Sequence, residues 1–208
     1  MKISLAQINP TVGDVQSNLK LIVKHAKIAQ KSNAEILITP ELSICGYPPE
    51  DLLLNKTFIQ DCDKSLIKIA KKFPKLKIIV GHPRSSKGML FNSASILYKG
   101  KIEATYDKQI LPNYGVFDEK RYFNAGNKNL IFSHKGKKFG LLICEDLWVK
   151  GPAEKLPIVD YTICINASPY DINKHKSRIS ELNKRFMYKK LSFNRSTLIY
   201  LNLVGGQD

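Results

Sequence analysis

Hydrophobic residues recur with helical spacing in three stretches of the chain. In residues 17–31 and 57–73, apolar positions follow one another in steps of three and four, which places them on one face of an amphipathic helix. Residues 175–194 show a similar but less regular spacing among many basic residues. The pattern therefore predicts three helices, the last of them strongly basic.

Short apolar runs between these stretches predict strands. Five runs stand alone, at residues 3–9, 35–39, 77–81, 161–166 and 196–204. Two further pairs flank a Lys-Gly dipeptide and indicate hairpins: 93–98 with 101–106, and 129–133 with 138–143. Strand–helix–strand units that are followed by hairpins predict an α/β fold with a mixed sheet.

The composition fits one packed domain. The chain has 208 residues, of which 43% are apolar and 25% are charged, so it can bury a core without disulfides. It contains no run of about 18 apolar residues and no signal-peptide pattern at its start, so neither a membrane span nor export is predicted. The four cysteines, at positions 45, 62, 144 and 164, lack Cys-x-x-Cys spacing, which argues against a zinc site. We expect a cytoplasmic protein.

The net charge of +15 has two interpretations. A basic chain can bind nucleic acid or another anionic partner, and residues 171–195 hold eight Lys or Arg against Asp171 and Glu181. Alternatively, the lysines are solvated, because net charge reports on solubility and nonspecific binding rather than on fold. No nucleic-acid-binding motif accompanies the charge, so we favour solvated lysines and predict neither a nucleic-acid nor a membrane partner.

Polar residues that directly follow predicted strands are the candidates for chemistry, since ligand sites of α/β folds gather at the carboxyl ends of strands. Glu41, Lys108 and Ser168 hold such positions, and so does the run Cys144, Glu145 and Asp146. Taken singly, each has an ordinary explanation as a core cysteine, a surface charge or a loop residue. Together, a thiol, a carboxylate and an ammonium support covalent catalysis. The ammonium lowers the thiol pKa and stabilises an oxyanion, while the carboxylate transfers protons.

Three segments, in this order, resemble the catalytic segments of the nitrilase, or carbon–nitrogen hydrolase, superfamily. They are PELSICGYPPEDLL (40–53), YDKQILPNYGVFDEKRYF (106–123) and LLICEDLW (141–148). These segments, with the terminal NLVGGQD (202–208), are most similar to the glutaminase domains of glutamine-dependent NAD synthetases. The resemblance covers nearly the whole chain and implies an αββα sandwich, in which two mixed sheets lie between helix layers.

The resemblance assigns catalytic roles to four residues. Cys144 matches the nucleophile, which attacks the side-chain amide of glutamine, releases ammonia and forms a thioester that water hydrolyses. Glu41 matches the general base and acid, and Lys108 matches the residue that stabilises the tetrahedral oxyanion. Glu119 matches a second glutamate near this triad, with a supporting role in orientation.

Three more residues match glutamine contacts of that family: Tyr114, Ser168 and Lys174. Ser168 has an equally good explanation as a turn residue before Pro169. The cysteines other than Cys144 are interpreted as structural. The mechanism that the resemblance implies needs no metal and no cofactor in this chain.

The resemblance also implies a division of labour. In such synthetases the glutaminase supplies ammonia to an ATP-dependent domain that amidates deamido-NAD to NAD, and only that domain needs ATP, Mg and a Ser-Gly-Gly phosphate loop. No Ser-Gly-Gly occurs in this sequence. Residues 1–208 are therefore predicted to be a glutaminase domain that lacks its C-terminal strands, with the synthetase domain absent. We expect it to work with that domain or a partner chain and to form homo-oligomers.

Two other functions stay open at this point. One is a stand-alone amidase of the same superfamily that acts on another small amide. The other is an inactive fragment or a basic interaction module, whose binding to nucleic acid would weaken steeply with salt.

Overall fold

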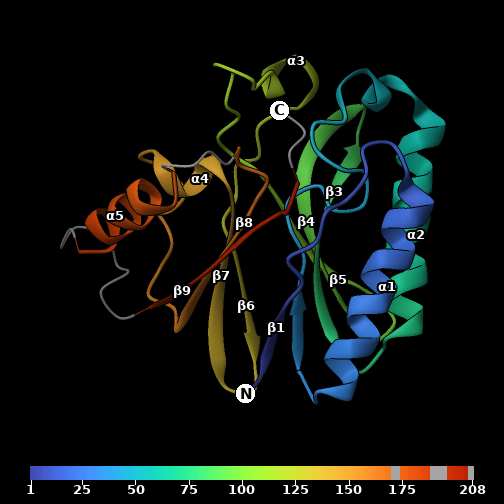
Figure 1. Ribbon diagram of the computed structural model, residues 1–208, viewed down its shortest axis with the longest axis horizontal. Coiled ribbons are helices and arrows are strands. Elements are labelled where there is room, and N and C mark those ends of the chain that lie inside the picture. The colour runs from blue at the N-terminus through green and yellow to red at the C-terminus, as the bar shows by residue number, and fades with distance from the viewer. Residues whose placement is uncertain (170–173, 188–195, 206–208) are drawn as a thin grey trace.

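Two mixed β-sheets form the centre of the molecule (Figure 1). The computed structural model describes residues 1–169, 174–187 and 196–205, without the side chains of 174, 175 and 185–187. The first sheet has the order β1 (Ile3–Leu5), β2 (Ile36–Ile38), β3 (Lys77–Ser86), β4 (Met89–Tyr98), β5 (Lys101–Asp107). The second has the order β6 (Leu130–His134), β7 (Lys137–Ile143), β8 (Tyr161–Asn166), β9 (Thr197–Asn202). Each sheet combines parallel and antiparallel pairs.

Helices cover the outer faces of both sheets. Helices α1 (Val15–Lys31) and α2 (Lys56–Lys72) lie on the first sheet, and α4 (Glu145–Trp148) and α5 (Lys174–Met187) lie beside the second (Figure 1). The short helices η1 (Glu50–Leu54) and α3 (Glu119–Tyr122) lie in loops at the end of the sheets drawn at the top. This αββα arrangement confirms the predicted fold class.

Three apolar clusters fill the spaces between these layers, and alternating side chains build them. In β2, Leu37 packs into the cluster beneath α1 and α2, whereas Ile36 and Ile38 belong to the cluster between the sheets. In β7, Leu141 faces the first sheet and Leu142 packs on the side of α4. Successive residues of a strand point to opposite faces, so these uninterrupted apolar runs reflect strands that are buried on both faces.

Three hairpin turns have the same sequence, Lys-Gly, at residues 87–88, 99–100 and 135–136. Both residues of each dipeptide have a positive φ, between 47° and 77°, as a type I′ turn requires. The sequence predicted the last two turns and missed the first. The reason is that β3 continues to Ser86 rather than ending at residue 81, through His82, Pro83 and Arg84, which interrupt the apolar run.

All three predicted helices differ from their predicted bounds, α2 by a shift of one residue, from 57–73 to Lys56–Lys72. Helix α1 begins two residues early, at Val15, because the Asp14 carboxylate accepts a hydrogen bond from the Ser17 N–H at 2.9 Å and caps the helix. Residues 188–194 of the predicted basic helix lie outside the described residues. Within α5, Leu182 packs against the second sheet, but Ile179 is 46% exposed, so the predicted apolar stripe is only partly correct.

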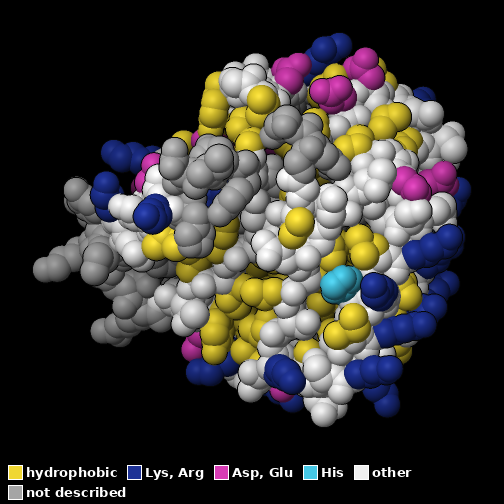
Figure 2. Space-filling view, viewed as in Figure 1, with side chains coloured by type: hydrophobic (Ala, Val, Ile, Leu, Met, Phe, Trp, Pro, Cys, Tyr) yellow, Lys and Arg dark blue, Asp and Glu magenta, His cyan; other side chains and the backbone are white. Residues whose placement is uncertain are grey.

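Lysines gather on the helices that cover the first sheet (Figure 2). The exposed ones are Lys20, Lys24, Lys27 and Lys31 on α1, and Lys56, Lys64, Lys68, Lys71 and Lys72 on α2. Their exposure is what the interpretation as solvated lysines requires. Within the part of the chain that the structure describes, no helix is long and apolar enough to cross a membrane.

Candidate active site

Cys144 occupies a sharp turn between β7 and α4. Its backbone has φ 46° and ψ −105°, a conformation that costs a non-glycine residue about 1–3 kcal/mol. The Cys144 N–H donates to the Ile165 carbonyl at 2.9 Å, and the Leu147 N–H donates to the Cys144 carbonyl at 3.0 Å. The surrounding strands thus hold the thiol in a strained but fixed position at the end of the second sheet.

Lys108, which directly follows β5, lies between two carboxylates. Its Nζ is 2.7 Å from Glu41 Oε1 and 2.7 Å from Glu119 Oε1. The side chains of Lys108, Glu41 and Glu119 are 0%, 1% and 4% exposed. A buried charge is tolerated when it is paired and hydrogen-bonded, and here two carboxylates face one ammonium. We call these three side chains the ionic centre.

Three donors from other parts of the chain complete the hydrogen bonding of the two carboxylates. The Asn92 amide donates to Glu41 Oε1 at 2.7 Å and lies 3.5 Å from Glu119 Oε2. The Tyr47 hydroxyl donates to Glu119 Oε1 at 3.1 Å. The Ala167 N–H donates to Glu41 Oε2 at 2.9 Å. Because Ala167 follows β8, this last bond joins Glu41 of the first sheet to the second sheet.

Two glycines let backbone segments approach closely behind the ionic centre. A Cβ atom on Gly81 would lie 2.3 Å from the carbonyl oxygen of Pro40, which precedes Glu41. A Cβ atom on Gly126 would lie 2.2 Å from the carbonyl oxygen of Asp107, which precedes Lys108. Any side chain at either position would therefore displace the segment that carries Glu41 or Lys108.

Burial and the excess of negative charge set the protonation states. Burial, together with the charge of Glu41, raises the pKa of Cys144 to about 12, and the opposing effect of Lys108 does not offset them. The effect of Lys108 on the thiol thus has the expected direction, but the thiol pKa is raised overall. Burial lowers the pKa of Lys108, but Glu119 and Glu41 together raise it well above its usual value. Burial raises the pKa of Glu119 to about 7, against the opposing effect of Lys108.

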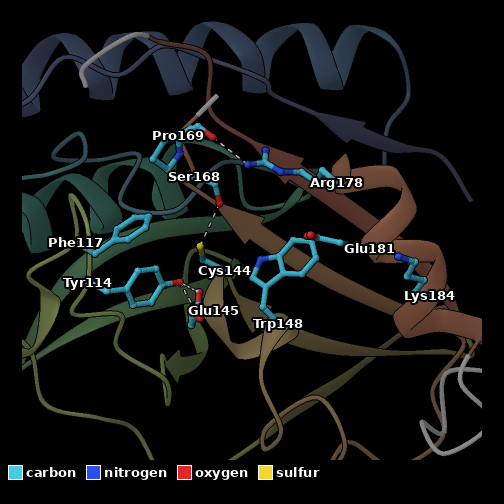
Figure 3. A pocket seen from close by; sticks show the side chains of 10 residues that line it. All are labelled: Tyr114, Phe117, Cys144, Glu145, Trp148, Ser168, Pro169, Arg178, Glu181 and Lys184. Atoms are coloured by element: carbon cyan, nitrogen blue, oxygen red, sulfur yellow. Dashed lines mark hydrogen bonds between the residues drawn. The ribbon is translucent and has the colours of Figure 1, made fainter. Parts of the chain in front are cut away.

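A pocket of about 510 Å³ opens over Cys144 (Figure 3). Aromatic rings from two segments line one part of it: Tyr114 and Phe117 from one loop, and Trp148 from α4. Charged side chains of α5 line another part: Arg178, Glu181 and Lys184. The nucleophile candidate is thus accessible from a cavity that offers apolar surface together with charges of both signs.

Two hydrogen bonds join side chains that line this pocket (Figure 3). The Tyr114 hydroxyl donates to Glu145 Oε2 at 3.0 Å, and Ser168 Oγ lies 3.4 Å from Cys144 Sγ. The Ser168 N–H donates to Asn202 Oδ1 at 2.8 Å, and Asn202 Nδ2 donates to the Ser168 carbonyl at 3.0 Å. Ser168 is therefore held with its hydroxyl against the thiol.

The predicted site residues fall into two groups in the structure. Glu41, Lys108 and Glu119 form the ionic centre, and Tyr114, Cys144 and Ser168 line the pocket. Lys174 is the first residue of α5, and its side chain lies outside the described residues.

Sequence reasoning gave no role to four residues at the site: Asn92, Glu145, Asp146 and Arg178. Asn92 follows Phe91 but precedes Ser93 in the chain, so the local pattern did not mark it. Glu145 and Asp146 directly follow Cys144 and were noted without a role. Arg178, which donates to the Pro169 carbonyl at 3.0 Å, is one of the basic residues close to the predicted contact Lys174 in the sequence, and it lines the pocket.

The other three cysteines are structural, as predicted. Cys45 and Cys62 are buried beneath α1 and α2, and Cys164 is buried in the cluster beside α4. Burial raises the pKa of all three thiols. Among the described residues, no group of three or more His, Cys, Asp or Glu side chains is placed to hold a metal ion.

A thiol, a carboxylate and an ammonium at the strand ends of an αββα sandwich agree with one family of enzymes. The sequence profile of the carbon-nitrogen hydrolases matches residues 2–177. The chain belongs to this family.

The chain is similar to individual proteins of two kinds, glutamine-dependent NAD(+) synthetases and an amidase. The chain is 40% identical over 210 residues to the glutamine-dependent NAD(+) synthetase of Acinetobacter baylyi, covering 100% of this chain and 38% of that protein. The solved structure of the glutamine-dependent NAD+ synthetase from Acinetobacter baumannii has a TM-score of 0.89 and 36% identity, covering 99% of this chain and 39% of that chain. The NitN amidase from Nesterenkonia sp. AN1 has a TM-score of 0.83 and 25% identity, covering 99% of this chain and 79% of that chain. The chain thus spans about two fifths of the length of the synthetases.

Proposed function

We propose that this chain is the glutaminase part of a glutamine-dependent NAD synthetase, which hydrolyses the side-chain amide of glutamine to supply ammonia. One observation carries the proposal. Cys144 faces a pocket beside a buried Glu41–Lys108–Glu119 centre, in a chain that is similar over its whole length to enzymes of that name.

The first half-reaction releases ammonia. Glu41 takes the thiol proton of Cys144 as Sγ attacks the amide carbon, a transfer that the raised pKa of the thiol makes necessary. The carbonyl oxygen becomes negative, and the Lys108 ammonium stabilises it. Glu41 then gives its proton to the departing nitrogen, the C–N bond breaks, and a γ-glutamyl thioester remains on Cys144.

The second half-reaction uses water. Glu41, ionised again, takes a proton from a water molecule that attacks the thioester carbon, and Lys108 stabilises the second oxyanion. The C–S bond breaks, Glu41 returns the proton to the sulfur, and glutamate leaves. In this scheme Glu119 acts through Lys108, because it holds the ammonium with a second ion pair beside that of Glu41.

The pocket suits a zwitterionic amino acid. Tyr114 and Ser168 are proposed as glutamine contacts, with Lys174 as a third. Carboxylates on the wall, from Glu145 and Glu181, complement an α-ammonium group, and the nearby basic side chains of α5 complement an α-carboxylate.

The released ammonia is proposed to be used by a part of the enzyme other than residues 1–208. We assign the ATP- and Mg-dependent amidation of deamido-NAD to a synthetase domain or partner chain, and we propose that the hydrolytic step itself uses no cofactor. A cytoplasmic location and assembly with further copies of this chain belong to the same proposal.

Ammonia and glutamate release from glutamine test this function. The wild type is expected to produce both in equal amounts. Cys144→Ala is expected to produce neither above background, while keeping the circular dichroism of the wild type. Equal rates for the two proteins would refute the thiol mechanism.

A second candidate is a stand-alone amidase that acts on another small amide. It is favoured by the similarity to the NitN amidase, which extends over 79% of that shorter chain. A panel of ω-amides and N-carbamoyl compounds separates the two functions. A kcat/KM above that for glutamine on any of them would favour this second candidate.

A further inference from the structure

We propose that Asp146 is a positioning residue that locks the turn of Cys144 to the segment that carries Lys108. The proposal rests on the proposed function, in that Cys144 and Lys108 act on the same amide. The two residues come from different sheets, since Lys108 follows β5 of the first sheet and Cys144 follows β7 of the second. Their relative position therefore depends on contacts between the sheets.

One oxygen of the Asp146 carboxylate binds the Lys108 segment. Asp146 Oδ1 accepts hydrogen bonds from the Gln109 N–H at 3.0 Å and from the Ile110 N–H at 2.8 Å. These two amides follow Lys108 directly in the chain. The carboxylate thus fixes the backbone at the base of the Lys108 side chain.

The other oxygen joins this contact to the nucleophile turn. Asp146 Oδ2 accepts from the Tyr106 hydroxyl at 2.8 Å and from the Ile143 N–H at 3.2 Å. Tyr106 lies two residues before Lys108, and Ile143 is the last residue before Cys144. A single carboxylate therefore receives donors from both sides of Lys108 and from the strand that ends at Cys144.

Three of these hydrogen bonds, from Tyr106, Gln109 and Ile110, join Asp146 to the Lys108 segment. The fourth, from the Ile143 N–H, ties Asp146 to the strand that leads to Cys144. The Asp146 side chain is fully buried, and four donors match the acceptor capacity of one ionised carboxylate. Burial raises its pKa to about 6, while the hydrogen bonds from Tyr106, Ile110 and Ile143 lower it. Burying this charge costs free energy. In exchange, the carboxylate fixes the position of the turn in which the Cys144 backbone is strained.

An amide in place of the carboxylate would break this link on one side. The asparagine side chain of Asp146→Asn has one acceptor oxygen and one NH₂ group. If its oxygen faces the Gln109 and Ile110 amides, its NH₂ group can donate to the Tyr106 hydroxyl, but the Ile143 N–H loses its acceptor. Displacement of a reacting group by about 1 Å can cost about 10²-fold in rate.

The test compares Asp146→Asn with the wild type in glutamine hydrolysis and in alkylation of Cys144 by iodoacetamide. We expect kcat to fall about 10²-fold with KM within about 3-fold. We also expect slower alkylation, since the thiol must reach Glu41 to lose its proton. Asp160→Asn is the matched control, because Asp160 also accepts from a backbone N–H, that of Lys138 at 2.8 Å, and should change neither rate by more than about 2-fold.

Tyr106→Phe provides the second variant, which removes one donor and leaves three. We expect it to lower kcat and the alkylation rate by several-fold, and it decides the question if Asp146→Asn does not fold. Unchanged kcat and alkylation in a folded Asp146→Asn protein, or in Tyr106→Phe where the first is unfolded, would overturn the proposal. If the wild type does not hydrolyse glutamine, the proposed function fails. The alkylation rates then still decide the role of Asp146.

Discussion

Two buried lysines, Lys77 and Lys108, differ in the number and the burial of the carboxylates that pair with them. Lys77 is 1% exposed and pairs with Glu103, which is 43% exposed. Its ammonium also lies 4.5 Å from the centroid of the Tyr98 ring and 5.4 Å from that of Phe132. Lys77 starts β3, so this pair lies at the amino end of the parallel strands and is open to screening by water and salt.

Lys108 lies at the opposite end of the strands and is enclosed with an excess of carboxylate. Both of its partners are almost fully buried. The excess negative charge raises the pKa of Lys108 itself, and Glu41 adds to the rise that burial causes in the pKa of Cys144. Burial of a lysine is therefore no sign of chemistry by itself. The unbalanced charge, close to the Cys144 thiol, is what distinguishes Lys108.

The largest expected loss of activity comes from removing the ammonium of Lys108, and removal of the Lys77 ammonium is the comparison. We expect Lys108→Met to lower kcat/KM for glutamine by about 10³-fold or more, because the oxyanion loses its stabilising charge. We expect Lys77→Met to stay within about 3-fold and to change the free energy of unfolding by no more than about 1 kcal/mol. Steady-state kinetics and urea denaturation measure both. A similar loss of kcat/KM in the two variants would contradict the proposed difference between Lys108 and Lys77.

The next effect concerns Asn92, which donates to a carboxylate partner of Lys108. Asn92→Leu removes the 2.7 Å hydrogen bond to Glu41 and leaves the proton-transfer group less well oriented. We expect kcat/KM to fall about 10²-fold, within the range for a displaced general base. The backbone bond from the Lys108 N–H to the Asn92 carbonyl should persist, so thermal unfolding serves as the control. A loss of stability without a kinetic loss would limit Asn92 to packing.

The excess of carboxylate also predicts a pH dependence of stability. Burial raises the pKa of Glu119 to about 7, above its ordinary value near 4.5, so the folded state binds this proton more tightly than the unfolded state. Glu119 therefore lowers the free energy of unfolding progressively as pH rises from about 4.5 to 7. Glu119→Gln should flatten the curve over that range in urea denaturation. Equal slopes for both proteins would contradict the raised pKa.

The smallest expected effect lies at the exposed wall of the pocket. Tyr114 is 59% exposed, and Tyr114→Phe removes its hydrogen bond to Glu145. One such bond contributes about 1 kcal/mol, so we expect KM for glutamine to rise about 5-fold at nearly constant kcat. Initial rates over a range of glutamine concentrations measure this. A fall in kcat as large as that of Asn92→Leu would place Tyr114 in the chemical steps instead.

The sequence predicted much of the fold because local patterns carry it. Apolar periodicity identified α1 and α2, and two of the three Lys-Gly turns marked hairpins. The extension of β3 to Ser86 was not predictable from periodicity, because its pairing with β4 is a tertiary effect that overrides the propensities of His82 and Pro83. The pairing of the two sheets across an apolar layer leaves no mark in the sequence beyond runs that are apolar on both faces.

The site was predictable where single residues follow strands and match known motifs. Glu41, Lys108 and Cys144 met both conditions. The roles of Asn92 and Asp146 depend on hydrogen bonds between segments that are 51 and 37 residues apart in the chain, and such bonds have no local signature. Lys108 lowers the pKa of the Cys144 thiol, as predicted, but the larger rise from burial and Glu41 depends on tertiary packing and was not predictable from the sequence.

During turnover, Cys144 is proposed to form a γ-glutamyl thioester with the substrate, and trapping with hydroxylamine tests this most directly. Hydroxylamine competes with water for a γ-glutamyl thioester. During glutamine hydrolysis by the wild type, we predict that γ-glutamyl hydroxamate replaces glutamate as hydroxylamine increases, while ammonia release continues. Cys144→Ala should form neither product. Continued formation of glutamate with no hydroxamate, at any hydroxylamine concentration, would contradict the account.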